Sequence, residues 1–466
     1  MVQLMRCLFC GLLQDEPAGV KTCPRCGGEL AFEMPPPPDQ LASYLEAQME
    51  LDQVKAPAGK AVDRYLLVSL RTPKAVPHDQ AALPGSSRPA LHFTAVLDGS
   101  GSMRGEKLQQ VKIAVRQALR HLLDGDWLSM VSFSDQPQRL LKPTRISSGV
   151  NDKVEGALHK LEAGGRTDLC AGLELGLGEA RARKCDTNLV LLLSDGQANM
   201  GETDLEAIGL RGRQARQQGI TVSTIGVGMD YNEALMAEIA TQGGGRFYHL
   251  QTPSQIVPYL TGELGEAANL AARDTRLHIS LPEGAVLVPL TAAYPVEQAG
   301  RDATVTIGDI ACDLELEIPL RLTLLGGMAG TRLSVEGQVR YHSPAGRALA
   351  TRLNRVTVRF VAAKGFGLYE GVVAPVTERV ARQIHAAQVL DVSRAMARDM
   401  EEGGLRAAIS LQALRDYSQR LGEEQAARVM AELGGEYDAM RASPVQAKSS
   451  VSASYVLQRS TRKFDG

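Results

Sequence analysis

The chain has 466 residues, of which 44% are hydrophobic and 22% charged, and its formal net charge is −2. This length exceeds what one hydrophobic core usually supports, so we expect about three domains. The near-neutral charge is not typical of a protein built to bind a polyanion. The sequence contains neither an apolar run of the ~20 residues that cross a bilayer nor a signal peptide at Met1. We therefore expect a cytoplasmic protein without a membrane span.

Two CxxC pairs, separated by twelve residues, lie near the N-terminus: Cys7, Cys10, Cys23 and Cys26. A glycine follows each pair, which suits a tight turn whose N–H groups face the sulfurs. Four thiolates from two such turns make a closed tetrahedral Zn²⁺ site. Because so short a segment cannot fold on hydrophobic burial alone, Zn²⁺ would supply most of its folding energy. Residues 1–33 are predicted to be a structural zinc ribbon.

Two other interpretations of these cysteines stay open. A rubredoxin-type iron site has similar turns, although this segment is short for that fold, and a redox CxxC pair lacks the surrounding βαβ pattern. Residues 1–33 carry three basic against four acidic side chains, so we expect no nucleic-acid binding. The remaining cysteines, Cys170, Cys185 and Cys312, are scattered, which indicates a reducing compartment and small core residues.

Residues 34–60 are predicted to be a linker that contains a short helix. Pro35–Pro38 form a stiff polyproline spacer, and Gln40–Leu51 is the expected helix. A strand-like run at 65–70 follows. We assign residues 61–88 to a β-sandwich whose other strands come later in the chain.

From residue 89 to 269, apolar runs of strand length alternate with segments of helical periodicity. Leu189–Leu193 is wholly apolar, as expected of a central parallel strand. Repeated strand–helix alternation predicts a doubly wound, Rossmann-like α/β sheet with helices on both faces. The expected elements are strands at 91–97, 127–133, 138–142, 189–193, 221–227 and 246–250, with helices at 106–123, 151–161, 168–183, 205–218 and 232–241.

The pattern changes after about Ala272. Short alternating strands punctuated by Gly and Pro place residues 270–370 in the same β-sandwich, so that the α/β domain would be inserted into it. Residues 375–442 are predicted to be a helical segment of two or three helices, broken at Gly403-Gly404 and Gly422. Residues 443–466, rich in Ser, Ala and Lys, are predicted to be an extended tail.

The run Asp98-Gly99-Ser100-Gly101-Ser102 lies between the first strand of the α/β region and its first helix. It places one carboxylate and two hydroxyls at the carboxyl edge of a parallel strand, where open α/β sheets bind ligands. Small clustered oxygen ligands suit a hard divalent cation. Because Gly/Ser-rich loops are common after strands, this run alone is a modest signal.

Three loops of this region resemble those of the von Willebrand factor A (VWA) domain over residues 91–268. The run 98–102 matches the DxSxS loop of that family's metal-ion-dependent adhesion site (MIDAS). Gly165-Arg166-Thr167-Asp168-Leu169 and Ser194-Asp195-Gly196 match its second and third loops, in the family's order. Arg166 is a departure, since it makes the second loop one residue longer than the commonest GGT form. The resemblance implies an intact MIDAS with the ligands Asp98, Ser100, Ser102, Thr167 and Asp195.

The chemistry of this ligand set agrees with Mg²⁺, with Mn²⁺ or Ca²⁺ as alternatives. Mg²⁺ takes octahedral oxygen coordination and keeps several waters. Two carboxylates at most leave the ion under-neutralised, so it attracts a carboxylate from outside. The resemblance implies that an Asp or Glu of a partner protein completes the metal's coordination, which makes the site a binding site and not a catalytic one.

We therefore expect an intracellular adaptor or scaffold protein of prokaryotic type, not an enzyme. The domain arrangement is similar to that of large groups of bacterial and archaeal A-domain proteins, including inter-alpha-inhibitor-like ones. That family often works beside MoxR-type AAA+ ATPases, so an accessory role to such an ATPase is one alternative.

The enzymatic alternative is a metal-dependent hydrolase with Asp98 as a phosphoryl-transfer nucleophile. Haloacid-dehalogenase-type phosphatases place a second Asp two residues later, where this chain has Ser100. A ubiquitin-ligase-like role for the cysteine pairs is disfavoured, because they supply one zinc site where a RING domain needs two.

Overall fold

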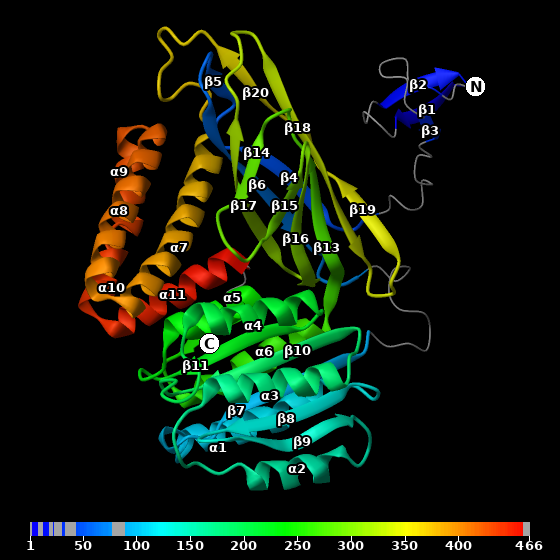
Figure 1. The fold of residues 1–466 in the computed structure, drawn as a ribbon, viewed down its shortest axis with the longest axis vertical. Helices are drawn as coiled ribbons and strands as arrows, with labels where there is room; N and C mark the ends of the chain where they lie inside the picture. Colours follow the sequence, from blue (N-terminus) through cyan, green and yellow to red (C-terminus); the bar gives the residue numbers. More distant parts are fainter. Residues whose placement is uncertain are drawn as a thin grey trace.

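The chain folds into a β-rich region, an α/β domain, a helical segment and a small N-terminal sheet (Figure 1). The computed structural model describes residues 2–7, 13–17, 22, 30–32, 43–76 and 89–459.

The N-terminal sheet is antiparallel and has three strands. Its order is β2 (Leu13–Pro17), β1 (Val2–Cys7), β3 (Leu30–Phe32). The backbone of Cys7 ends β1 opposite Leu30. The other three predicted zinc ligands lie outside the described residues, so the zinc ribbon stays a prediction: Cys10, Cys23 and Cys26.

The β-rich region consists of two mainly antiparallel sheets. The four-stranded sheet has the order β14 (Val286–Pro289), β17 (Glu315–Leu324), β6 (Val62–Arg71), β4 (Glu46–Leu51). The seven-stranded sheet has the order β15 (Val296–Ala299), β16 (Asp302–Ala311), β13 (Leu270–Ser280), β18 (Arg332–His342), β20 (Val356–Val361), β5 (Lys55–Pro57), with β19 (Ala348–Arg352) beside β18.

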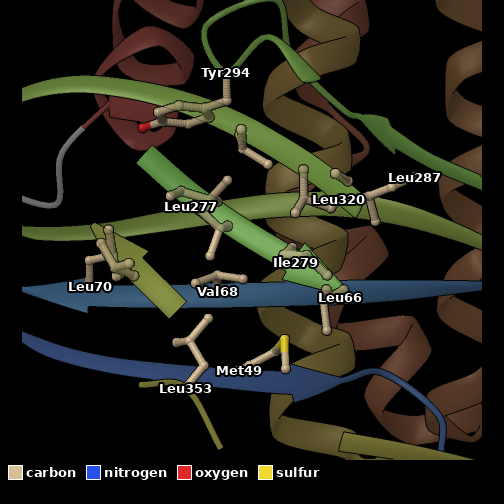
Figure 2. Packing of buried hydrophobic residues seen from close by; sticks show 14 of the residues in the cluster. Met49, Leu66, Val68, Leu70, Leu277, Ile279, Leu287, Tyr294, Leu320 and Leu353 are labelled. Atoms are coloured by element: carbon tan, nitrogen blue, oxygen red, sulfur yellow. The ribbon is translucent and has the colours of Figure 1, made fainter. Parts of the chain in front are cut away.

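Apolar side chains of both sheets pack into one core (Figure 2). Met49 and Val68 come from the four-stranded sheet, and Leu277 and Ile279 come from β13 of the other. All four are buried. Strand β6, which precedes the α/β domain in the chain, pairs with β17, which follows it. The α/β domain is therefore flanked in sequence by two hydrogen-bonded strands of one sheet.

The prediction of a helix at Gln40–Leu51 is wrong. Residues 46–51 form strand β4, which pairs antiparallel with β6 and places Met49 opposite Val68. Polar and apolar side chains alternate strictly along this strand, and Met49 and Leu51 are buried. Alternation with a period of two favours a strand, and pairing with β6 stabilises it.

The α/β domain is built on a six-stranded sheet, which confirms the prediction of a doubly wound α/β fold. Its order is β12 (Gly244–Leu250), β11 (Thr221–Val227), β10 (Thr187–Ser194), β7 (Leu91–Asp98), β8 (Trp127–Phe133), β9 (Pro137–Arg145). Neighbouring strands are parallel except at the edge strand β9, which is antiparallel to β8.

Helices cover both faces of this sheet. Successive residues of a strand point to opposite faces, so each strand supplies apolar side chains to the helices on both sides. Ala95 and Leu97 of β7 join one buried cluster, and Val96 joins another. The first cluster includes α1 (Glu106–Ala118), α2 (Val150–Lys160) and α6 (Ile256–Ala268). The second includes α3 (Leu169–Ala182), α4 (Leu205–Gln217) and α5 (Glu233–Gly243).

The helical segment joins the other two parts of the molecule (Figure 1). Val380 of its first helix shares a buried cluster with Leu67 of β6, and Val389 shares another with Leu235 of α5. Among the described residues, no helix is long and apolar enough to cross a bilayer. The helices are α7 (Ala374–Arg398), α8 (Met400–Ser418), α9 (Glu423–Leu433), α10 (Glu436–Ala442) and α11 (Pro444–Arg459).

Two predictions about the C-terminal part are wrong. The expected tail contains α11, because Val451 and Tyr455 are buried against the α/β domain, which compensates for the weak helix propensity of a Ser-rich stretch. The expected break at Gly403-Gly404 lies instead at Asp399, whose side chain caps α8 by accepting from the Glu401 N–H at 2.9 Å. A side chain at Gly403 would collide with Met396 of α7, so this glycine allows the two helices to pack closely.

Asp52 is a buried polar contact between the helical segment and the β-rich region. This fully buried carboxylate accepts hydrogen bonds from the Tyr65 N–H at 2.8 Å, from Arg420 at 2.9 Å and from the Tyr417 hydroxyl at 3.2 Å. Burial raises the pKa of Asp52, while the Tyr65 N–H and Arg420 counteract the shift. One carboxylate thus ties the end of α8 to the sheet.

Replacing Asp52 by alanine is expected to lower the free energy of unfolding by about 3 kcal/mol, because Arg420 and the Tyr65 N–H lose their partner. Urea unfolding followed by circular dichroism measures the change. Asp124→Ala, at an exposed position of the α/β domain, is the matched control. Equal stability of the two variants would contradict this role for Asp52.

Candidate metal-binding site

The candidate site lies at the carboxyl edge of the α/β sheet. Strands β7 and β10 are parallel neighbours, with Leu97 opposite Leu193. Both strands therefore end at the same edge, and Asp98 and Asp195 leave them side by side. Both carboxylates are fully buried.

Hydrogen bonds fix the carboxylate of Asp98. Its Oδ1 accepts from the Ser100 N–H at 2.7 Å, and its Oδ2 accepts from the Ser194 hydroxyl at 2.5 Å. Burial raises the pKa of Asp98, while these serine hydrogen bonds lower it and the charge of Asp195 raises it further. Two buried carboxylates of like charge favour a cation between them.

Three hydroxyls converge on one point beside Gly196. A Cβ atom built on Gly196 would lie 3.1 Å from Thr167 Oγ1, 3.5 Å from Ser102 Oγ and 3.8 Å from Ser100 Oγ. The hydroxyl oxygens of Ser100 and Ser102 are 3.0 Å apart and form a hydrogen bond. Because residue 196 is a glycine, no side chain is placed against these three hydroxyl oxygens.

The loop of Thr167 reaches the site in spite of its additional residue. Gly165 has a φ of +76°, and the N–H of Arg166 donates to Asp135 at 3.0 Å, so the extra residue is taken up by a turn that points outward. The first loop is tied to this one, since Gly101 N–H donates to the Gly165 carbonyl at 3.1 Å. Asn199, which the sequence analysis did not single out, accepts from the Thr167 N–H at 3.0 Å.

Helix α3 starts directly after Thr167 and is anchored close to the sheet. Asp168 caps it by accepting from the Ala171 N–H at 2.9 Å. Side chains at Gly172 and Gly176 would collide with Phe133 of β8 and Val96 of β7. These glycines let the helix approach the two strands, which holds the Thr167 loop at the sheet edge.

Lys107 is a second residue of the site that the sequence analysis missed. Its ammonium group forms an ion pair with Asp195 Oδ2, while Ser102 donates to Asp195 Oδ1 at 2.7 Å. Both oxygens of Asp195 thus have partners. The available signal in the sequence was a lysine in the first turn of a helix, where positive charge is unfavourable.

The residues present fit a hard divalent cation. Two carboxylates and three hydroxyls supply only oxygen, which Mg²⁺ prefers over nitrogen and sulfur. Within the described residues, no group of three or more His, Cys, Asp or Glu side chains could hold a metal ion. The candidate site is of another type, because three of its five ligands are hydroxyls. The structure brings all five predicted MIDAS residues to one place: Asp98, Ser100, Ser102, Thr167 and Asp195.

Positive side chains lie on the rim of the site. Arg104 follows Ser102 by two residues and Arg166 precedes Thr167, and both side chains are exposed. The exposed carboxylate of Asp135 also lies near the second loop. Exposed side chains of both charges thus flank the loops of the site in the sequence.

Comparisons with known proteins agree with this architecture. The family model of the von Willebrand factor type A domain matches residues 93–262. Uncharacterized protein YfbK of Escherichia coli (strain K12) is 28% identical over 317 residues, which cover 63% of this chain and 55% of YfbK. The chain thus spans little more than half the length of that relative.

Two solved structures have a similar fold along most of the chain. A von Willebrand factor type A protein from Catenulispora acidiphila has a TM-score of 0.62 at 15% identity, covering 90% of this chain and 98% of its own. An ArnB paralog, VWA2, from Sulfolobus acidocaldarius has a TM-score of 0.55 at 17% identity, covering 89% and 99%. The two structures show the fold alone, and the family model identifies residues 93–262, the Rossmann-like α/β part of this chain, as a von Willebrand factor type A domain.

Proposed function

We propose that this protein is an adaptor whose VWA domain binds an acidic residue of a partner protein through Mg²⁺. VWA domains mediate protein interactions, and the observation that carries the proposal is the convergence of three hydroxyls and two buried carboxylates beside Gly196. Asp98 and Asp195 would anchor the cation, and the hydroxyls of Ser100, Ser102 and Thr167 would complete the protein's share of its shell. Mn²⁺ or Ca²⁺ would fit the same oxygens.

An acidic partner follows from the electrostatics of this set. The carboxylates of Asp98 and Asp195 would balance a bound divalent cation, and the ammonium group of Lys107 beside Asp195 would leave the loaded site with a net positive charge. Arg104 and Arg166 add positive charge at the rim. A carboxylate from outside can reach the cation beside the exposed Ser102.

The residues around Asp98 favour a binding site over a catalytic site. The position two residues later is Ser100, whose hydroxyl contacts Ser102 and whose N–H donates to Asp98. No carboxylic acid stands there to protonate a leaving group. We place the protein in the cytoplasm on the basis of its cysteine usage, and an AAA+ ATPase is one partner that would suit an adaptor of this kind.

The partner's attachment is expected to need both Asp98 and the metal. Protein captured from lysate by the wild type in Mg²⁺ is expected to be lost in EDTA and lost in Asp98→Ala, because both changes remove the cation. Mass spectrometry of the captured protein is the measurement, with Asp124→Ala as the control. A partner that is retained equally in every condition would refute the metal-bridged attachment.

Filling the space beside Gly196 is expected to abolish metal binding without removing any ligand. In Gly196→Val the new Cβ would lie 3.1 Å from Thr167 Oγ1 and 3.5 Å from Ser102 Oγ, so the branched side chain would crowd the hydroxyls that the cation needs. Electron paramagnetic resonance of Mn²⁺ measures the affinity. Gly178→Val is the control, because its Cβ would meet nothing within 4 Å. Unchanged Mn²⁺ affinity in Gly196→Val would place the cation elsewhere.

The N-terminal segment is expected to hold about one Zn²⁺ per chain. Elemental analysis of the purified protein measures it, and the double variant Cys7→Ser with Cys10→Ser is expected to lose the zinc. Iron in place of zinc, or no metal, would reject the zinc ribbon.

A further inference from the structure

Lys107 occupies a position that helix electrostatics disfavours. It is the second residue of α1, and the amino terminus of a helix carries partial positive charge that repels a cation. Its side chain is 26% exposed and is directed at Asp195, which is fully buried. A residue that breaks a local rule at a functional site indicates a role beyond helix formation.

The Lys107 ammonium group lies close to Asp195 and to the loop after β11. It forms the ion pair with Asp195 Oδ2. It also lies 3.8 Å from where a Cβ on Gly228 would stand, in the loop after β11. Gly228 has a φ of +78°, and its N–H donates to the Leu250 carbonyl at 2.8 Å, so this loop is itself fixed. The ion pair thus places the ammonium group beside Asp195.

The Lys107 ammonium group changes the net charge of the site. The carboxylates of Asp98 and Asp195 together with the ammonium of Lys107 leave a single negative charge. A divalent cation converts it to a single positive charge. Without Lys107 the cation-loaded site would be neutral and would have less attraction for an anion.

We propose that Lys107 determines the ligand specificity of the site: it weakens cation binding and strengthens the binding of a carboxylate to the loaded cation. This inference rests on the proposed function, because it requires a divalent cation beside Gly196. The coupling is electrostatic. It acts between a positive side chain and two buried carboxylates, where charges interact more strongly than in bulk water.

The test measures cation and anion binding separately on the full-length chain. Mn²⁺ affinity is measured by electron paramagnetic resonance, and acetate is then titrated while water-proton relaxation reports displacement of Mn²⁺-bound water. In Lys107→Met, which keeps an unbranched aliphatic stem, Mn²⁺ is expected to bind about tenfold more tightly and acetate about tenfold more weakly. Lys107→Arg is expected to retain wild-type behaviour for both ligands. Lys112→Met, in the same helix, is the matched control.

The outcome is decisive because the two affinities of Lys107→Met are expected to change in opposite directions, Mn²⁺ binding becoming tighter and acetate binding weaker. A variant that had merely loosened the fold would bind both ligands more weakly, and that result would overturn the role of Lys107. Tighter Mn²⁺ binding with unchanged acetate binding would overturn it as well, because Lys107 would then only compete with the cation. A wild type that binds no Mn²⁺ would instead overturn the proposed metal site and this inference together.

Discussion

Two buried carboxylates of like charge, Asp98 and Asp195, are the constraint on which the functional edge of this molecule depends. The parallel pairing of β7 with β10 brings them together, and burial raises the cost of leaving their charges unbalanced. Serine donors and one lysine offset part of that cost. The remaining negative charge would favour the cation that we propose, so the sheet topology and the chemistry of the edge are linked directly.

The helical segment holds the α/β domain against the β-rich region. Helix α7 packs on β6 of the β-rich region through Val380 and on α5 of the α/β domain through Val389. Helix α11 adds a buried lysine, Lys448, which donates to Glu233 at 2.7 Å and lies 4.0 Å from the ring centroid of Tyr231. Because these contacts are buried, the helical segment fixes the α/β domain relative to the sheets.

Local sequence patterns predicted elements well where one pattern dominated. The wholly apolar run of β10 could only be a buried strand in a protein that alternates strands with helices. The prediction of a helix at Gln40–Leu51 fails because residues 46–51 alternate with a period of two, which favours strand β4. The prediction of an extended C-terminal tail fails for another reason: α11 is stabilised by Val451 and Tyr455 packing on distant parts of the chain, and composition does not report such contacts.

The sequence by itself determined the doubly wound α/β domain and the identity of five oxygen-bearing residues, because strand periodicity and loop motifs are local. Only the tertiary structure decided that three hydroxyls meet beside Gly196, that Asn199 holds Thr167, and that Lys107 reaches Asp195. These contacts join residues from separate loops. Their geometry depends on strand pairing and on the close approach of α3 at Gly172 and Gly176, which no local pattern encodes.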